Sequence, residues 1–206
     1  MGYQMLPGVP LQNHLDAAKA NNTYPRLATQ LAHFLRELHS FPAQASGLEL
    51  PAHDRVRPEA LPGLYQAVRA CLYPRMRADA RDLIADQFHT YLDDPASRHY
   101  RQVLRHGDLG PGNVLVMPET HEISGVIDFG STGLDDPALD LGVVSFWGEA
   151  LLGSDFLERL YQSYVVTECL LNRIRFFEML CALMVALEGL EKGDRQAFAF
   201  GLAKYA

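Results

Sequence analysis

The hydrophobic positions along this 206-residue chain predict a mostly helical protein. Between Pro25 and Leu38, leucine and phenylalanine recur at the spacing of one helix face, and a Phe-Pro pair then ends the run. Residues 59–92 show a similar pattern, which breaks at Pro74 into two helical pieces. Towards the C-terminal end we expect four further helices, over residues 138–150, 154–168, 171–191 and 194–205.

The pattern changes in the middle of the chain. Two short apolar runs, residues 114–117 and 123–127, flank a turn, which is typical of a β-hairpin. Residues 1–11 contain several Pro and Gly breakers and are expected to form a connector. Residues 131–137 are expected to form a loop. The sequence therefore predicts one small sheet within a helical chain.

Composition and charge narrow the class of protein. Of the residues, 48% are hydrophobic and 21% are charged, as in ordinary globular proteins. The net charge of −7 argues against nucleic acid as the main partner, because phosphate backbones attract clustered Lys and Arg. The three cysteines form neither a zinc pattern nor a disulfide framework, which favours a cytoplasmic protein. We find no signal-peptide pattern and no apolar run of about 20 residues, so no membrane partner is expected.

Two polar segments at the ends of the predicted hairpin carry the chemistry. Residues 106–113 read HGDLGPGN, and residues 127–130 read IDFG. An Asp with an Asn five positions later, followed by Asp-Phe-Gly, is the order found in kinase-like phosphoryl transfer. Asp108 suits the base that deprotonates an attacking hydroxyl group. Asn113 and Asp128 suit the oxygen ligands of Mg²⁺, and the hairpin would bring all three together.

These segments resemble those of the aminoglycoside phosphotransferase and choline kinase-like family. Residues 35–39 and 136–141 are also similar to motifs of that family. The resemblance covers nearly the whole chain but only the C-terminal lobe of the family. It implies an α+β, mostly helical fold, the C-terminal lobe of the protein kinase-like fold with a small catalytic β-hairpin and no N-terminal lobe. Residues 1–11 would be the interlobe hinge or linker, and residues 12–206 the phosphotransferase lobe.

The resemblance also implies roles for single residues. Asp108 would be the catalytic base, and His106 would belong to the same catalytic loop. We interpret His106 as a packed histidine that orients the loop. Asn113 and Asp128 would hold Mg²⁺, and Asp140 would brace the catalytic loop. In the hinge, the base of ATP or GTP would meet the backbone around Gln4, Met5 and Leu6.

Two kinase features are not found ahead of these segments. The chain shows no glycine-rich loop and no strand lysine, which in kinases clamp and align the triphosphate. Three explanations stay open: a shortened longer protein, a natural lobe-only protein, or an N-terminal lobe carried by another chain. Without that lobe, an apolar face near the hairpin would be exposed and could drive a homodimer or bind a partner chain.

Two classes of function compete. The first is an ATP-dependent phosphotransferase that acts on a hydroxyl group of a small molecule, by resemblance an aminoglycoside or amino-sugar-like substrate. The second is a catalytically incomplete lobe that acts as a non-catalytic binding module for a small molecule or protein. Four acidic residues of the C-terminal helices would suit a polycation, or are simply solvated helix faces: Glu149, Asp155, Glu158 and Glu178.

Overall fold

The computed structural model describes residues 6–42, 59–93 and 99–206. Its helices are α1 (Leu15–Ala20), α2 (Tyr24–Ser40), α3 (Leu61–Cys71), α4 (Ala78–Asp93), α5 (Ala138–Leu152), α6 (Ser154–Tyr164), α7 (Glu168–Lys192) and α8 (Arg195–Leu202). Its strands are β1 (Val9–Pro10), β2 (Val103–Arg105), β3 (Val114–Val116), β4 (Ile123–Val126) and β5 (Gly133–Asp135). Short 3-10 turns occupy Leu11–Asn13, Tyr73–Arg75 and Phe129–Ser131.

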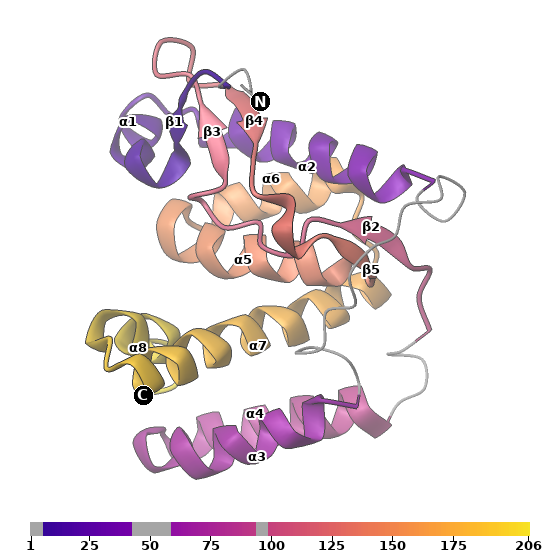
Figure 1. Cartoon of the computed structure of the whole chain (residues 1–206), viewed down its shortest axis with the longest axis vertical. Coiled ribbons are helices and arrows are strands. Elements are labelled where there is room, and N and C mark those ends of the chain that lie inside the picture. Colours follow the sequence, from indigo (N-terminus) through magenta and orange to yellow (C-terminus); the bar gives the residue numbers. More distant parts are fainter. Residues whose placement is uncertain (1–5, 43–58, 94–98) are drawn as a thin grey trace.

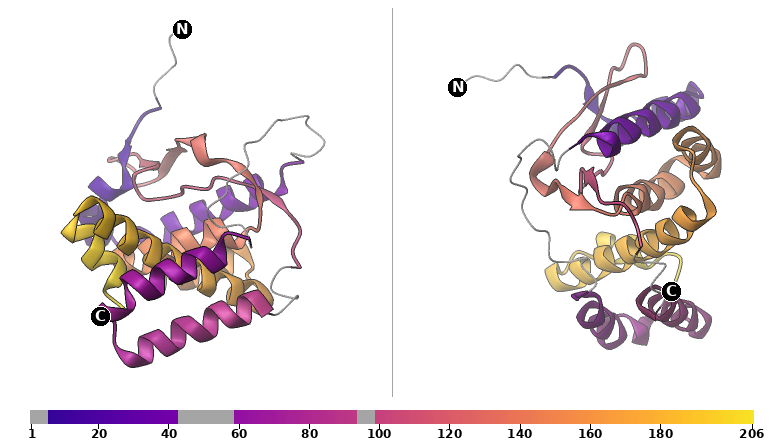
Figure 2. Two further views of the ribbon diagram at one scale, coloured as in Figure 1. Left: turned by 60° about the horizontal axis from the view of Figure 1, so that its bottom comes forward. Right: turned by 90° about the vertical axis from the view of Figure 1, so that its right-hand side faces the viewer.

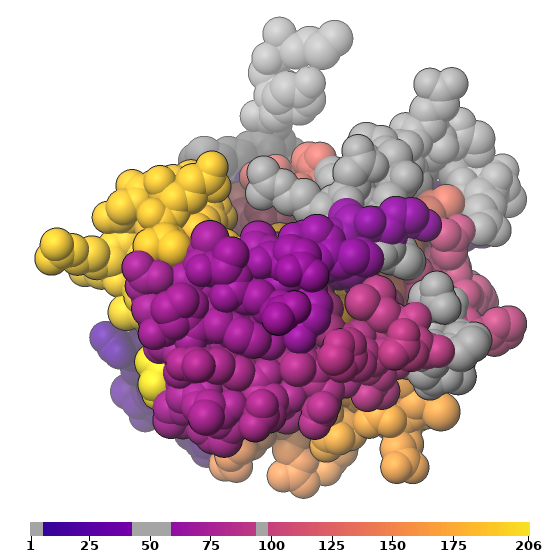
Figure 3. Space-filling model, turned by 90° about the horizontal axis from the view of Figure 1, so that it is seen from below, coloured from indigo at the N-terminus to yellow at the C-terminus, as the bar shows by residue number. Residues whose placement is uncertain are grey.

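The helices form a stack, and the strands lie along one side of it (Figure 1). Helix α2 packs on α6, both α6 and α7 pack on α5, and α8 packs on α7. Helices α3 and α4 cover the remaining side of α7, and the two further views agree with this order (Figure 2). Seen from below, α3 and α4 form most of the surface, with the C-terminal helices beside them (Figure 3). None of the helices described is both long and apolar enough to span a membrane.

The core follows from the helical periodicity. In α2 the leucines at positions 27, 31 and 35 are buried, as their spacing predicts. Helices α5 and α7 are buried on several faces, because each lies between other helices. Between α4 and α7, Tyr91 stacks on Phe176 with ring centroids 4.0 Å apart. Buried aromatic contacts of this kind fix how α4 sits on α7.

The expected hairpin is present, but the sheets are larger than the sequence pattern indicated. Strands β3 and β4 pair antiparallel, and β1 adds a third strand, with Val9 opposite Val116. The expectation of a plain connector over residues 1–11 is therefore wrong for Val9 and Pro10. Strands β2 and β5 form a second sheet of two strands, so the loop expected over residues 131–137 contains a strand. Both missed strands are too short to show an alternating pattern.

Most helix predictions are confirmed, with shifts at the ends. The predicted break at Pro74 lies in the 3-10 turn between α3 and α4. Helix α6 stops at Tyr164, because Val165 adopts a left-handed conformation with φ of 68°. Helix α7 begins at Glu168 and not at residue 171, because the Thr167 side chain caps it by accepting a hydrogen bond from Leu170 N at 3.3 Å.

Candidate functional site

The loop of residues 106–113 connects β2 to β3, and the side chain of Asn113 forms hydrogen bonds across it. Asn113 Nδ2 donates to the carbonyl oxygen of Asp108 at 2.7 Å and lies 3.3 Å from Asp108 Oδ2. Asp108 is exposed, so its carboxylate faces solvent while Asn113 limits its orientation. Two of the predicted site residues therefore touch directly.

His106 is completely buried and points away from solvent. Its Nε2 lies 2.9 Å from the carbonyl oxygen of Ile127, which requires a proton on Nε2. Its Nδ1 accepts a hydrogen bond from the backbone N–H of Asp108 at 3.2 Å. The ring also lies against Phe129, with ring centroids 4.6 Å apart. This neutral histidine thus connects the two polar segments, which agrees with an orienting role.

Asp140 lies beneath the loop, in the first turn of α5, and is completely buried. Its Oδ2 accepts a hydrogen bond from the backbone N–H of His106 at 2.7 Å, and its Oδ1 accepts one from that of Gly107 at 2.8 Å. His39 Nε2 lies 3.2 Å from Oδ2. Burial alone would raise the pKa of the Asp140 carboxyl, but the bonds from His39 and the two amides lower that pKa below its ordinary value. The carboxylate form is thereby stabilised.

Asp128 follows β4 and comes close to the first loop through the backbone. The N–H of Ile127 donates to the carbonyl oxygen of Asn113 at 3.0 Å. Asp128 itself adopts a left-handed conformation with φ of 63°, and its Oδ1 accepts a hydrogen bond from Gly130 N at 3.4 Å. A left-handed aspartate is uncommon and directs this exposed side chain into a tight turn. Asn113 and Asp128 are thus neighbours at one end of the hairpin.

Asn113 and Asp128 carry amide and carboxylate oxygens, which are donors of the kind that Mg²⁺ prefers. Both Asn113 bonds use its nitrogen, so within the described residues its Oδ1 has no hydrogen-bond donor and is available as a ligand. Mg²⁺ is usually held by one or two carboxylates together with phosphate and water oxygens. No group of three or more His, Cys, Asp or Glu side chains in the described segments could hold a metal ion unaided. One amide and one carboxylate oxygen would fit an ion whose other ligands are phosphate and water oxygens.

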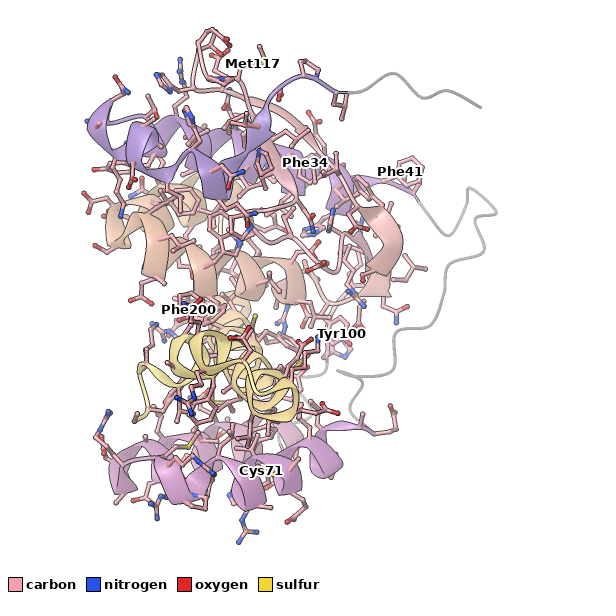
Figure 4. All side chains as sticks on the ribbon, turned by 60° about the vertical axis from the view of Figure 1, so that its left-hand side comes forward. Phe34, Phe41, Cys71, Tyr100, Met117 and Phe200 are labelled. Carbon is pink, nitrogen blue, oxygen red and sulfur yellow. The ribbon has the colours of Figure 1, made fainter. Side chains whose placement is uncertain are left out.

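The predicted hinge is described only in part. Gln4 and Met5 lie outside the described residues, so nothing is reported on them. Leu6 is 46% exposed, and a side chain on Gly125 of β4 would come within 2.8 Å of Leu6 Cδ1. Ser124 also donates a hydrogen bond to the carbonyl oxygen of Pro7 at 2.6 Å. The segment of Leu6 and Pro7 therefore runs beside β4, near the hairpin whose outer end carries Met117 (Figure 4).

Two residues of the site were not predicted from the sequence. His39 contacts both Asp140 and Tyr164. Its position four residues after Leu35 on the buried face of α2 was the available signal. Trp147, the one tryptophan of the chain, donates from Nε1 to the carbonyl oxygen of Leu109 at 2.8 Å. No local motif marks this contact, because it joins α5 to the loop across 38 residues.

The four acidic residues considered for a cationic substrate do not form one patch. Glu149 and Glu178 both bind Lys204, which compensates part of their charge. Asp155 and Glu158 lie on α6, beside Asn22 and Tyr24. A separate groove of about 470 Å³ runs between α3 and α7 and is lined by Leu64, Met184, Leu187, Glu188, Glu191 and Lys192.

Known proteins resemble this chain over most of its length. The sequence pattern of the phosphotransferase enzyme family matches residues 1–175. Viomycin phosphotransferase of Streptomyces vinaceus is 31% identical over 210 residues, which is 97% of this chain and 67% of that relative. The aminoglycoside 3′-phosphotransferase of Streptomyces ribosidificus is 31% identical over 99 residues, which is 46% of this chain and only 38% of that relative.

Solved structures share the fold. The GDP complex of wild-type aminoglycoside 2′-phosphotransferase-IIIa aligns with a TM-score of 0.75 at 25% identity, over 98% of this chain and 67% of that chain. A GDP and kanamycin complex of a 2″-phosphotransferase aligns with a TM-score of 0.76 at 25% identity, over 98% of this chain and 68% of that chain. A choline/ethanolamine kinase family protein from Mesorhizobium loti shares the fold alone. It aligns with a TM-score of 0.62 at 18% identity, over 90% of this chain and 63% of that chain.

These likenesses confirm the predicted α+β, mostly helical fold of the protein kinase-like class. They also confirm the resemblance to the aminoglycoside phosphotransferase family, including the assignment to kinases of that type. With residues 1–175 matched, the chain belongs to the phosphotransferase enzyme family.

Proposed function

We propose that this chain transfers the terminal phosphoryl group of a nucleoside triphosphate to a hydroxyl group of a small molecule. The observation that supports it most is the pair of hydrogen bonds that joins the segments of Asp108, Asn113 and Asp128 at one end of the hairpin. Asn113 bonds to Asp108 through its side chain and to Ile127, the neighbour of Asp128, through its backbone. Base and metal ligands of phosphoryl transfer must lie this close together, because they act on one reacting phosphate.

In this proposal Asp108 is the catalytic base. Its exposed carboxylate accepts the proton of the acceptor hydroxyl group while the acceptor oxygen forms a bond to the γ-phosphorus. The bond from that phosphorus to the bridging oxygen breaks, and the nucleoside diphosphate leaves. Asn113 restricts the Asp108 side chain, and His106 orients the loop through the Asp108 amide. General-base catalysis of this kind contributes a factor of about 10²–10⁴ in rate.

Asn113 Oδ1 and the Asp128 carboxylate would hold Mg²⁺. The ion would supply positive charge against the triphosphate. The amide ligand adds no further negative charge beside the phosphates. Two of the aligned structures are GDP complexes, so both ATP and GTP are candidates for the donor. The backbone of the hinge around Gln4, Met5 and Leu6 would contact the base.

The acceptor is proposed to be an antibiotic-like small molecule, with an amino-sugar-like compound as the first candidate. The support comes from relatives named for viomycin and for aminoglycosides. The groove between α3 and α7 carries Glu191, and also Glu188 in an ion pair with Lys192, and is large enough for such a compound. An acceptor with several ammonium groups would be attracted to the Glu191 carboxylate.

The experiment that tests this function varies the acceptor. The 206-residue chain is incubated with Mg²⁺ and either ATP or GTP, and the release of ADP or GDP is followed. Each reaction contains one acceptor: viomycin, an aminoglycoside, a macrolide, choline or a sugar. We expect at least one acceptor to raise the rate well above the background, and we expect EDTA to abolish the increase. If nucleotide binds but no acceptor raises the rate with either nucleotide, the chain acts instead as a binding module.

A further inference from the structure

In the described part of the chain, a buried arginine beneath the catalytic loop has a side-chain nitrogen without a hydrogen bond. Arg105, the last residue of β2, is only 4% exposed. Its Nε is the one buried side-chain nitrogen or oxygen that lacks a hydrogen bond in the described part of the chain. Three other arginines there, Arg26, Arg77 and Arg173, form ion pairs with carboxylates, whereas Arg105 forms none. A buried charge without a partner is costly, so such a group is expected to bind something.

The guanidinium borders a small cavity. The cavity has a volume of about 100 Å³, whereas a water molecule needs about 10–15 Å³ of the same measure. Its polar side is formed by Arg105, Gly107 and Asp140, and its apolar side by Phe177, Cys181 and Met184 among others. The space is therefore large enough for a small organic ion and offers it one positive charge and a hydrocarbon wall.

Gly107 leaves room for the guanidinium beside the loop. A side chain at Gly107, which has φ of +87°, would collide with Arg105 Nη1 and with the carbonyl oxygen of Ser131. The glycine thus leaves the space that the guanidinium occupies. Asp140 is the one carboxylate on the cavity wall, and both its oxygens already bind His106, Gly107 and His39. It opposes an anion through its charge but leaves the donors of Arg105 unused.

We propose that this cavity binds a small free carboxylate, such as acetate, on Arg105. A planar carboxylate matches the donors of a guanidinium and accepts two parallel hydrogen bonds from it. The apolar wall of Phe177 and Met184 suits the short hydrocarbon part of the ion. This site lies under the catalytic loop and does not depend on the proposed phosphotransferase activity.

Acetate binding is measured on the whole chain at constant pH and ionic strength. Sodium acetate is compared with the sodium salt of 2-(N-morpholino)ethanesulfonate, which is too bulky for the cavity. Fluorescence of Trp147, which is bonded to the loop at Leu109, and the thermal unfolding midpoint are followed. We expect a saturable change in both signals with acetate and none with the bulky anion.

Matched variants identify the residue. Arg105→Met should weaken acetate binding about tenfold or more, because it removes the charged donors. Arg101→Met, a change at an exposed arginine just before β2, should leave binding unchanged. If Arg105→Met fails to fold, Cys181→Leu keeps the arginine, fills the cavity and should abolish binding. Equal responses to acetate and the bulky anion, or undiminished acetate binding in the cavity variants, would show a water-filled cavity and overturn the proposal.

Discussion

Asp140 shows how one residue can hold the catalytic loop without facing a substrate. It is the acceptor for two consecutive backbone amides, those of His106 and Gly107. Both amides lie in the turn ahead of Asp108, so the carboxylate fixes the direction from which Asp108 emerges. His39 and Tyr164 continue the chain of hydrogen bonds towards α6. The loop is thereby attached to the stack of helices.

Asp140→Asn should weaken this attachment. The amide group keeps the size of the side chain but places an N–H against one of the backbone donors. A buried donor left without an acceptor costs about 1–3 kcal/mol, so the free energy of unfolding should fall by that amount. Urea unfolding measures it, with Asp82→Asn on the exposed face of α4 as the control. An unfolding midpoint as high as that of the control variant would contradict the bracing role.

A pair of histidines joins the start of α1 to the hairpin turn. His14 Nε2 lies 2.7 Å from His121 Nδ1, and His14 is buried. Burial, followed by the charge of His121, lowers the pKa of His14 below 6.5. The folded chain therefore binds a proton at His14 less readily than the unfolded chain does. The resulting stability is fully present above pH 6.5 and is lost as the pH falls through the lowered pKa.

Two substitutions test this pH dependence. His14→Gln removes the titrating group, so the loss of stability below pH 6.5 should become smaller. His33→Gln changes an exposed histidine on α2 and should leave the slope as it is. The free energy of unfolding is measured by urea titration at several pH values for each protein. If the free energy of unfolding changes with pH equally in the wild type and in His14→Gln, the histidine pair is not the cause of the pH dependence.

At the scale of elements, the fold depends on close contact between helices. Gly142 of α5 faces α7, and a Cβ at this position would lie 2.7 Å from Phe177 Cβ and 2.9 Å from Glu178 N. Backbone atoms of α7 cannot move aside as the end of a side chain can. This contact holds α5, which carries Asp140 and Trp147, against the longest helix of the stack.

Gly142→Ala and Gly63→Ala should therefore have opposite effects. Both glycines lie within helices, so alanine favours the helix in both cases by about 0.5–1 kcal/mol. At Gly63 a Cβ meets nothing within 4 Å, and we expect the chain to become more stable. At Gly142 the collision with α7 should dominate and destabilise the chain by about 1–3 kcal/mol. The thermal unfolding midpoints of the two variants are compared with that of the wild type. Equal stabilisation by both substitutions would contradict the close packing of α5 on α7.

Long elements could be predicted from the sequence, and short ones could not. The leucine stripe from Leu27 to Leu35 fixes α2, because it repeats over several turns. Strand β1 has two residues and β5 three, which is too few for an alternating pattern. Their pairing depends on distant partners, Val116 and Arg105 among them, that only the tertiary structure supplies.

At the scale of the whole molecule, the site combines segments far apart in the chain. Asp108, Asn113 and Asp128 could be found from the sequence, because their spacing is a local motif. The contacts of His39, Trp147 and Arg105 could not, because they arise only when α2, α5 and α7 pack around the loop. Motif spacing indicates the candidate reacting groups, and packing determines how their loop is held.

The chain also aligns with only part of its relatives. It covers 67% of viomycin phosphotransferase and 67–68% of the two 2′- and 2″-phosphotransferase structures. The assignment of residues 1–11 to a hinge and residues 12–206 to a lobe stays a prediction. Phosphoryl transfer by this chain is accordingly a proposal, and it is tested on the chain itself.

The most direct test of the central claim is the appearance of phosphorylated acceptor in single-turnover reactions, detected by mass spectrometry. The wild type, Asp108→Asn and the control Asp82→Asn are compared with the acceptor that gives the highest rate. We expect the wild type and Asp82→Asn to form product at similar rates, and Asp108→Asn to be slower by a factor of about 10²–10⁴. Product formation by Asp108→Asn at the rate of the wild type would contradict the account.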